Sequence, residues 1–491
     1  MIIKNESDLI EQYTTDASNM KGKAEIVYIP ETISELKEVI NECYRKDLPI
    51  TISGAGTGMT GSRVALEGAV ISTEKLNKIL DIDPQKQFVV VQPGISLSDL
   101  ENTLSEYNLF YPPNPTEKNG TIGANLATNA SGSRTFKYGA TRRWVEGVNL
   151  FLSNGEEILL GRSDNLFNCN SINLHSDSGN SYNIEINSIK IPDVKHAAGY
   201  YFRPNMDAID LFIGSEGTLG VFSEIKLKVL RLPEKVIGAI IFFDDMDNLL
   251  SFVDEVREAS KQNFENDYKI VNIISARLIE FFDYFSLEML REKYPQLPQN
   301  AKGAIWIEQE CIVENEDIIL NNWYNLINRF TSLEDDTWIA LNDKEHNNFR
   351  DFRHALPLQI TDIVTMNHQK KIGTDTAVPD KFLHEYFKFI KNQVTGSKLP
   401  FVIFGHIGNS HFHGDLFTKT SEEYDRAIQC YNNCISEALR LEGTVSAEHG
   451  IGKLKKKYLL QMFGQDGIDE MKRIKQIFDP KNLLGRYNLF D

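Results

Sequence analysis

The chain has 491 residues, which is more than one hydrophobic core usually supports, so we expect two or three domains. Its apolar fraction of 41% and charged fraction of 25% are typical of globular proteins, and no stretch approaches the roughly 20 apolar residues of a membrane span. The formal charge of −17 argues against nucleic-acid binding, and five scattered cysteines without a CxxC pair argue against a disulfide framework or an iron–sulfur cluster.

The N-terminal third combines helical and strand-like patterns. Residues 1–16 lack the basic start and apolar run of a signal peptide, so the cytoplasm is the expected compartment. Thr32 and Glu35 have the spacing of a capping box and precede apolar residues at helical spacing, which predicts an amphipathic helix. Short apolar runs predict buried strands at residues 50–54, 69–73 and 88–93. This part of the chain is therefore predicted to be α+β.

The composition and the hydrophobic pattern of the rest of the chain change at two places. Residues 162–195 are rich in Asn, Ser, Asp and Gly, which predicts a surface insertion, either a loop or a hairpin. After residue 233, strand-like runs at 236–243 and 304–310 alternate with helical stretches, which predicts a second α/β or α+β domain over residues 234–430. The final segment, residues 431–491, contains a helix that is predicted to stop at Asp479 because Pro480 follows.

The first of three glycine-rich loops follows the strand at residues 50–54. Gly56 to Gly61 match the GxGxxG pattern, but a Rossmann fold requires a helix directly afterwards, and here the chain passes Gly68 and returns to a strand. We therefore reject the Rossmann fold. The glycines still allow backbone N–H groups to approach a phosphate closely, although a tight turn without a ligand is an alternative.

Two further loops have the same composition. Residues 119–147 crowd glycine, alanine, serine and threonine together, and residues 211–229 contain Gly214, Gly217 and Gly220 before a strand-like run. Small residues let the backbone pack against a flat ligand. Three such loops are difficult to explain as turns alone, and they favour an extended ligand that contains phosphates and rings.

The sequence also places several imidazoles and a carboxylate near one another. His406, His411 and His413 follow a strand-like run, and His406 and His413 converge only if the intervening glycines bend the chain. Glu448 and His449 precede another glycine turn. Two imidazoles and a carboxylate are a workable ligand set for Zn²⁺ or Mn²⁺. On this spacing alone, satisfied surface or core histidines are an equally open alternative.

Taken together, the three loops and the histidine motifs resemble the vanillyl-alcohol-oxidase and p-cresol-methylhydroxylase (PCMH) flavoprotein superfamily, in its D-lactate, glycolate and D-2-hydroxyglutarate dehydrogenase branch. The resemblance is weakest over residues 162–195 and 234–345. It implies an α+β fold with a two-subdomain FAD-binding domain of the PCMH type over residues 1–233. It further implies an α/β substrate (cap) domain over 234–430, and a helical segment, 431–491, that returns to the FAD domain.

The resemblance implies which residues hold FAD. Relatives with covalent flavin use a histidine or cysteine in or near such loops, whereas the first loop here has Ala55 and Thr57, so non-covalent FAD is implied. The pyrophosphate would contact Gly54, Ala55, Gly56, Thr57, Gly58, Gly61 and Ser62. The flavin and ribityl chain would contact Pro93, Thr121, Gly123, Ala124, Asn129, Ser131 and Gly132. The nucleotide would lie near Gly217 and Val221.

The resemblance also implies a divalent metal, Zn²⁺ or Mn²⁺, held by His406, His413 and Glu448. His449 would act as the base, and Arg353 would bind the substrate carboxylate, a surface arginine being the alternative. The family's Asp-Gly-Asn is Asn409-Ser410-His411 here, which leaves the metal identity open. Gly373 stands where the hydroxyglutarate enzymes have a lysine, which weakens the prediction of a dicarboxylate substrate.

The implied activity is FAD-dependent oxidation of a D-2-hydroxy acid to the 2-oxo acid, with metal-assisted substrate binding and hydride transfer to flavin N5. Electrons would leave to an external acceptor, which we expect to be electron transfer flavoprotein, a quinone or a cytochrome. A homodimer is the candidate oligomeric state. The alternatives are a flavin oxidase or non-redox flavin enzyme of the same superfamily that acts on another substrate, or a flavin-binding partner protein whose site has decayed.

Overall fold

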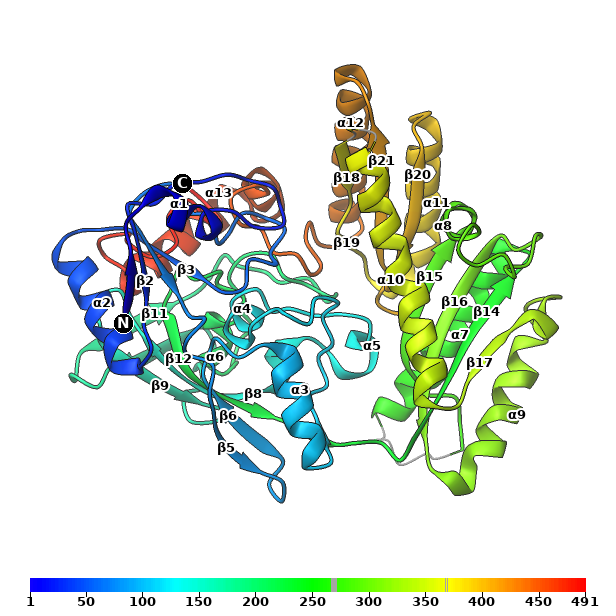
Figure 1. The fold of residues 1–491 in the computed structure, drawn as a ribbon, viewed down its shortest axis with the longest axis horizontal. Helices are drawn as coiled ribbons and strands as arrows, with labels where there is room; N and C mark the ends of the chain where they lie inside the picture. The colour runs from blue at the N-terminus through cyan, green and yellow to red at the C-terminus, as the bar shows by residue number, and fades with distance from the viewer. Residues whose placement is uncertain (266–271, 367, 369) are drawn as a thin grey trace.

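The computed structural model describes residues 1–265, 272–366, 368 and 370–491. They form two lobes, one built from the N-terminal part of the chain and the other from the segment that follows β13 (Figure 1). The C-terminal end returns to the first lobe, where the backbone N–H of Gly485 donates to the carbonyl of Ile50 over 2.8 Å. The first lobe is therefore closed by residues from both ends of the chain.

A four-stranded sheet lies at the start of the first lobe. Its strand order is β1-β2-β4-β3, and β4 runs parallel to both β2 and β3. The predicted amphipathic helix is confirmed as α2 (Ile33–Arg45), whose N-cap Thr32 accepts a hydrogen bond from the N–H of Glu35. Leu36, Val39 and Ile40 of α2 are buried against this sheet. The strands are β1 (Ile2–Lys4), β2 (Ile26–Ile29), β3 (Ile50–Ser53) and β4 (Ala69–Ser72), and the short helix α1 (Ser7–Ile10) follows β1.

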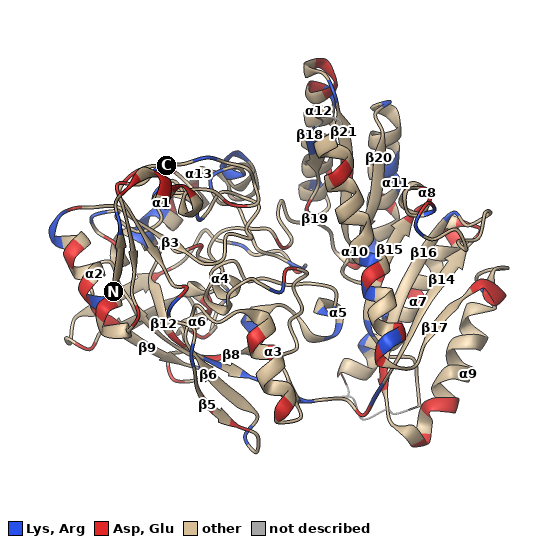
Figure 2. Ribbon diagram, in the orientation of Figure 1, with Lys and Arg blue, Asp and Glu red and all other residues tan. Residues whose placement is uncertain are grey.

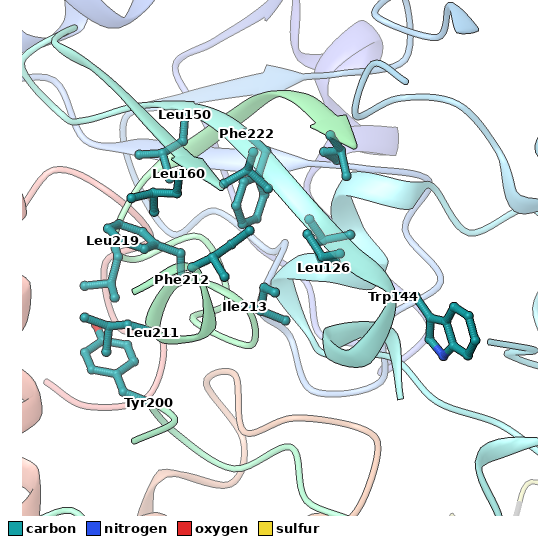
Figure 3. Packing of buried hydrophobic residues seen from close by; sticks show 14 of the residues in the cluster. Leu126, Trp144, Leu150, Leu160, Tyr200, Leu211, Phe212, Ile213, Leu219 and Phe222 are labelled. Atoms are coloured by element: carbon teal, nitrogen blue, oxygen red, sulfur yellow. The ribbon is translucent and has the colours of Figure 1, made fainter. Parts of the chain in front are cut away.

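A five-stranded antiparallel sheet forms the rest of this lobe. Its order is β5-β6-β12-β8-β9, from β5 (Ile79–Asp83), β6 (Phe88–Val91), β12 (Val221–Lys228), β8 (Val145–Phe151) and β9 (Glu157–Gly161). The apolar side chains of this sheet pack against the elements that carry the second and third glycine-rich loops, as Leu150, Phe212 and Phe222 illustrate (Figure 3). The associated elements are α3 (Leu97–Glu106), α4 (Ile122–Ala127), α5 (Thr135–Tyr138), α6 (Ile209–Phe212), β7 (Leu109–Phe110) and β13 (Leu230–Arg231).

The Asn- and Ser-rich segment contains a hairpin, which is one of the two alternatives predicted from the sequence. Strand β10 (Ser171–His175) pairs antiparallel with β11 (Ser181–Glu185). The chain after the hairpin is held by helix α13 (Lys456–Phe478), because the buried carboxylate of Glu470 accepts the backbone N–H groups of Asn187 and Ser188. Helix α13 is kinked at Gly464 and ends before Asp479, as predicted.

The second lobe is organised around an eight-stranded sheet. Every pairing among the described residues of this sheet is antiparallel, so of the two alternatives from the sequence this lobe is α+β. The order is β17-β14-β16-β15-β20-β21-β18, and β19 pairs with β21. The strands are β14 (Lys235–Phe243), β15 (Ala276–Asp283), β16 (Gly303–Cys311), β17 (Trp338–Ala340), β18 (Lys370–Gly373), β19 (Thr376–Ala377), β20 (Phe401–Gly405) and β21 (His411–Thr418).

Helices cover this sheet and leave apolar cores on both of its faces. The helices are α7 (Met246–Glu265), α8 (Tyr284–Leu290), α9 (Glu316–Ile327), α10 (Asp343–Met366), α11 (Leu383–Gly396) and α12 (Ser421–Arg440). Both signs of charge are distributed over both lobes (Figure 2). Within the described ranges no helix combines the length and apolarity that a membrane crossing requires.

Candidate functional site

A cavity in the first lobe lies where the glycine-rich loops meet. Backbone from the first loop forms one side of it, the start of α4 forms a second, and the turn before β12 forms a third. The residues predicted to contact FAD that line this cavity are Gly54, Gly56, Thr57, Gly58, Ser62, Pro93, Gly123, Ala124, Gly217 and Val221. The segments that the sequence singled out therefore converge on one space.

The cavity wall has the chemistry that a dinucleotide needs. A Cβ on Gly217 would meet no atom within 4 Å, and one on Gly58 would meet only Asp16 at 3.8 Å, so bare backbone faces open space at both positions. Gly56 has φ +81° and lies against the Arg63 side chain, which excludes a larger residue there. Arg63 also lines the cavity, and its buried Nε has no hydrogen-bond partner. This unused donor fits a phosphate oxygen.

The remaining predicted contacts lie outside the cavity lining. The Asn129 side chain binds backbone groups of His196 and Arg142, and Gly132 is packed tightly against the carbonyl of Asn114. The Ser131 hydroxyl points to Glu448 at 3.4 Å. The others are Ala55, which is exposed, Gly61, whose N–H binds Asp16, and Thr121, whose hydroxyl lies against Gly54.

Sequence reasoning missed a buried carboxylate that joins the loop to the C-terminal segment. Glu216 is 4% exposed and accepts the N–H groups of Ile451 and Gly452 at 2.7 and 2.8 Å, and the hydroxyl of Ser62. Burial raises the pKa of Glu216, against these hydrogen bonds. The residue follows Ser215 in the third loop, but only the fold reveals its distant partners.

Beside this cavity, imidazoles and carboxylates gather at the junction of the lobes. Ligating atoms of His406, His411, His413 and Glu448 all lie within 4.8 Å of one another. Glu448 Oε2 is 3.2 Å from His406 Nε2, and its Oε1 is 3.1 Å from His413 Nε2. The chain bends between β20 and β21, where Gly405 has φ +136°, and this bend brings the two histidines together. We call these four residues the histidine cluster.

The hydrogen bonds around the cluster orient two of its imidazoles. His406 Nδ1 is 2.5 Å from Glu280 Oε1, and His413 Nδ1 is 3.2 Å from the carbonyl oxygen of Thr374. Both contacts leave Nε2 directed at Glu448. A ligating histidine ordinarily uses its second nitrogen in this way, so the donor set fits a divalent ion. Burial lowers the pKa of His406, but Glu280 outweighs that effect and raises it.

Lys195 brings a positive charge into the same place. Its Nζ lies 2.6 Å from Glu448 Oε2 and 3.2 Å from His411 Nδ1. Burial raises the pKa of Glu448, but the charges of Lys195 and His406 dominate and hold it well below its usual range. His411 is fully buried, and burial together with Lys195 holds its pKa well below 6.5. His411 is therefore neutral, and its Nδ1 accepts from the ammonium.

His449 connects the cluster to the cavity where the glycine-rich loops meet, which we call the flavin cavity. It lines that cavity, and its Nδ1 is 3.3 Å from Oδ2 of the buried Asp375. Burial lowers the pKa of His449 to about 4, against the opposing effect of Asp375. Asp375 also accepts from Lys455 at 2.8 Å, and its pKa is held well below 3.8. A neutral imidazole oriented by a carboxylate can accept a proton at physiological pH.

Arg353 lies on α10 and belongs to a buried ion pair. Its Nε donates to Glu280 Oε2 over 3.0 Å, and the other oxygen of that carboxylate contacts His406. Arg353 and His406 line a common cavity. The arginine is thus buried at the site, not on the surface. Glu280 and Lys195 were absent from the sequence predictions because neither lies in a motif with the histidines.

Two protein-family models match most of the chain. Residues 24–161 match the family model described as the FAD binding domain, and residues 232–489 match the C-terminal domain of FAD linked oxidases. Among solved structures, an alkyldihydroxyacetonephosphate synthase aligns over 98% of this chain and 81% of its own, with a TM-score of 0.66 and 14% identity. At that identity the alignment concerns the fold alone.

Curated relatives cover almost the whole chain. It is 27% identical to glycolate oxidase subunit GlcD of Bacillus subtilis, over 97% of this chain and 92% of the relative. The same three values describe the D-lactate dehydrogenase of Anaerostipes hadrus. Identity to the D-2-hydroxyglutarate dehydrogenase of Xanthomonas citri is 25%, over 95% and 89%. The chain therefore belongs to the FAD-linked oxidase family, as its motifs predicted, and is an FAD-binding oxidoreductase with a PCMH-type fold.

Proposed function

We propose that the protein oxidises a D-2-hydroxy acid to the 2-oxo acid, with a divalent ion held by His406, His413 and Glu448. One observation carries the proposal: His449 lines the flavin cavity, and the adjacent residue, Glu448, belongs to the histidine cluster. A substrate held at the cluster would lie beside both the flavin and a candidate base. The names of the relatives, which include glycolate oxidase and D-lactate dehydrogenase, support the substrate class.

Bound FAD supplies the acceptor for the hydride of the substrate carbon. A divalent ion at the cluster supplies a Lewis acid for carboxylate and hydroxyl oxygens. Side chains of the protein accept the proton and bind the substrate carboxylate. Asp375 orients His449, whose Nε2 accepts the hydroxyl proton, and the low pKa of that imidazole keeps it available as a base. Arg353, fixed by Glu280, attracts the substrate carboxylate.

Electrons leave the reduced enzyme through an external acceptor in this proposal. Electron transfer flavoprotein, a quinone or a cytochrome are the candidates, and the name of a Saccharomyces cerevisiae relative, D-lactate dehydrogenase [cytochrome] 1, is consistent with the last. A homodimer and a cytoplasmic location stay predictions. Non-covalent FAD also stays a prediction, which denaturation tests directly, because it releases free flavin only when no covalent bond exists.

Anaerobic absorbance of the purified protein near the flavin bands tests the proposal. Glycolate, D-lactate, D-2-hydroxyglutarate and the L-isomers are added in turn, before and after chelation. We expect one D-2-hydroxy acid to bleach the flavin, chelation to block the bleaching, and Zn²⁺ or Mn²⁺ to restore it. A yellow protein that none of these acids bleaches contradicts the hydroxy-acid assignment and favours a superfamily enzyme with another substrate. A colourless protein favours a decayed partner protein.

A further inference from the structure

A second cavity, of about 220 Å³, lies between the lobes and shares His406 and Arg353 with the candidate site. We call it the basic cavity. Its wall combines the first lobe, through α3 and the loop before α4, with β15, β16 and α10 of the second. The charged side chains in the wall, apart from the histidines, are Lys118, Arg134, Arg350, Arg353, Glu101 and Glu280. Four cations therefore face two carboxylates.

The two carboxylates are already engaged. Glu101 accepts from Lys118 over 2.8 Å, and Glu280 accepts from Arg353 over 3.0 Å. Among the described residues, Arg134 and Arg350 have no carboxylate within the 4.0 Å of an ion pair. These two guanidinium groups leave the cavity with uncompensated positive charge. Such a cavity attracts anions and disfavours neutral ligands.

Two buried hydrogen-bond donors in the wall also lack partners. The Nε of Arg134 and the Nε1 of Trp306 are buried and make no hydrogen bond. Trp306 is 4% exposed and lies on β16 directly opposite Glu280 of β15. A buried donor without an acceptor is costly, and such groups commonly mark a place where a ligand or water binds. Because both residues line the basic cavity, an oxyanion bound there is a candidate acceptor for these donors.

The cations lie close enough to affect one another. Burial lowers the pKa of Lys118, and the charges of Arg134 and Arg350 lower it further, against the effect of Glu101. Burial and Arg277 lower the pKa of Arg134 to about 10, so its guanidinium remains charged at neutral pH. Like charges held together in a half-buried wall repel one another, and a bound anion relieves that repulsion.

We propose that the basic cavity binds a second carboxylate of the substrate, so that the preferred substrate is a dicarboxylic 2-hydroxy acid. The sequence argued against such a substrate because Gly373 replaces a lysine, but in this proposal Arg134 and Arg350 supply the positive charge instead. The inference rests on the proposed function, because the hydroxyl-bearing end is assigned to the histidine cluster. His406 belongs to both the histidine cluster and the basic cavity, because its Nε2 faces Glu448 and it also lines the cavity. A substrate that spans them presents its distal carboxylate to Arg134 and Arg350.

Equilibrium binding tests the cavity without turnover. The FAD-loaded protein is titrated calorimetrically with glutarate and with butyrate, which share an aliphatic chain of similar length but differ by one carboxylate. We expect glutarate to bind at least about 10-fold more tightly, and Arg134→Gln and Arg350→Gln each to remove most of that difference. Lys344→Gln, an exposed charge on α10 outside the wall, is the matched control. Equal affinity for the two acids overturns the inference.

Anaerobic flavin reduction separates this inference from the proposed function. We expect Arg134→Gln to lower kcat/KM for D-2-hydroxyglutarate about 10-fold or more, and that for D-lactate less than about 3-fold. Equal losses for both acids overturn the inference and leave the proposed function standing. Reduction by neither acid contradicts the proposed function, and the glutarate titration then decides on the cavity alone. Arg350 is exposed, so its variant preserves the test if Arg134→Gln fails to fold.

Discussion

The flavin cavity and the histidine cluster are neighbours built by opposite means. The cavity is lined largely by backbone and small side chains from loops of the first lobe, each compact in sequence. The cluster depends on long polar side chains that approach from separate parts of the chain. Lys195 comes from the first lobe, Glu280 from β15 and Glu448 from the segment before α13. Loss of one side chain should therefore disable the cluster, whereas the cavity should be disabled by an added side chain.

Glu448→Gln breaks the cluster alone. Its carboxylate lies 3.2 and 3.1 Å from the two imidazoles, so the change removes the negative charge around which they are arranged. We expect flavin reduction by the preferred hydroxy acid to fall on the order of 10³-fold, and the metal content to fall, while FAD stays bound. Stopped-flow absorbance and elemental analysis measure the two effects.

The matched control is Glu442→Gln, an exposed carboxylate six residues earlier in the chain, paired with Lys381. It should leave both quantities unchanged. If Glu448→Gln instead retains metal and rate but loses FAD, the division between cavity and cluster is wrong.

Gly58→Leu is expected to disable the flavin cavity and to leave the histidine cluster intact. Gly58 lines the flavin cavity, and a Cβ there meets only Asp16 at 3.8 Å, so the side chain enters open space without disturbing the empty protein. We expect FAD affinity to fall at least about 100-fold, while metal binding at the cluster is retained. Flavin fluorescence titration and chelator competition are the measurements. Gly396→Leu, at the exposed end of α11 where a Cβ meets no atom within 4 Å, controls for an added leucine without backbone strain. Undiminished FAD binding would show that the cavity does not hold the dinucleotide.

The same contrast explains what the sequence revealed. Glycine enrichment after strands is a local signal, and it marked the three loops as suited to an extended ligand. The family resemblance then named individual residues, ten of which line the cavity, including Gly54, Gly123 and Gly217. The sequence predicted α2 and the end of α13 for a similar reason, because caps and proline act within a few residues. The histidine spacing left a metal site and ordinary buried histidines equally open until the motifs were compared with a family.

What the sequence did not reveal consists of contacts between distant segments. Glu280 is 126 positions from His406, and Lys195 is 253 positions from Glu448. Such pairs depend on how β15 and the two lobes are positioned, which no local pattern encodes. The family resemblance implied a flavin contact for Asn129, and this contact stays a prediction. In the structure the Asn129 amide binds backbone groups of His196 and Arg142.

Asp283→Asn tests whether the stability of the second lobe can be changed without affecting the flavin cavity or the histidine cluster. Asp283 ends β15 and caps α8, and burial raises its pKa to about 6 from 3.8. The folded state therefore holds this proton more tightly than the unfolded state, and stability is lost as pH rises from about 4 through 6. Asparagine keeps the acceptor for Ser286 without the charge. We expect unfolding free energy at pH 8 to rise by about 3 kcal/mol, with no gain below pH 4.

Chemical denaturation at both pH values measures this effect, and FAD and metal contents serve as controls because neither should change. A gain that is equal at pH 4 and pH 8 would mean that the charge of Asp283 is not its cause.

Glu280→Gln gives the smallest and most specific of these effects. Glu280 is not among the residues that line the flavin cavity, and it orients His406 through Nδ1 and fixes Arg353. We expect metal affinity, measured by chelator competition, to fall about 10- to 100-fold with FAD binding unchanged. The matched control is Glu308→Gln, which removes another buried carboxylate paired with an arginine and a histidine, Arg277 and His346, on the adjacent strand. Both variants should be less stable, and only Glu280→Gln should lose metal. An equal loss in both would trace the effect to general destabilisation of the sheet, and the histidine cluster would then not depend on its distant carboxylate.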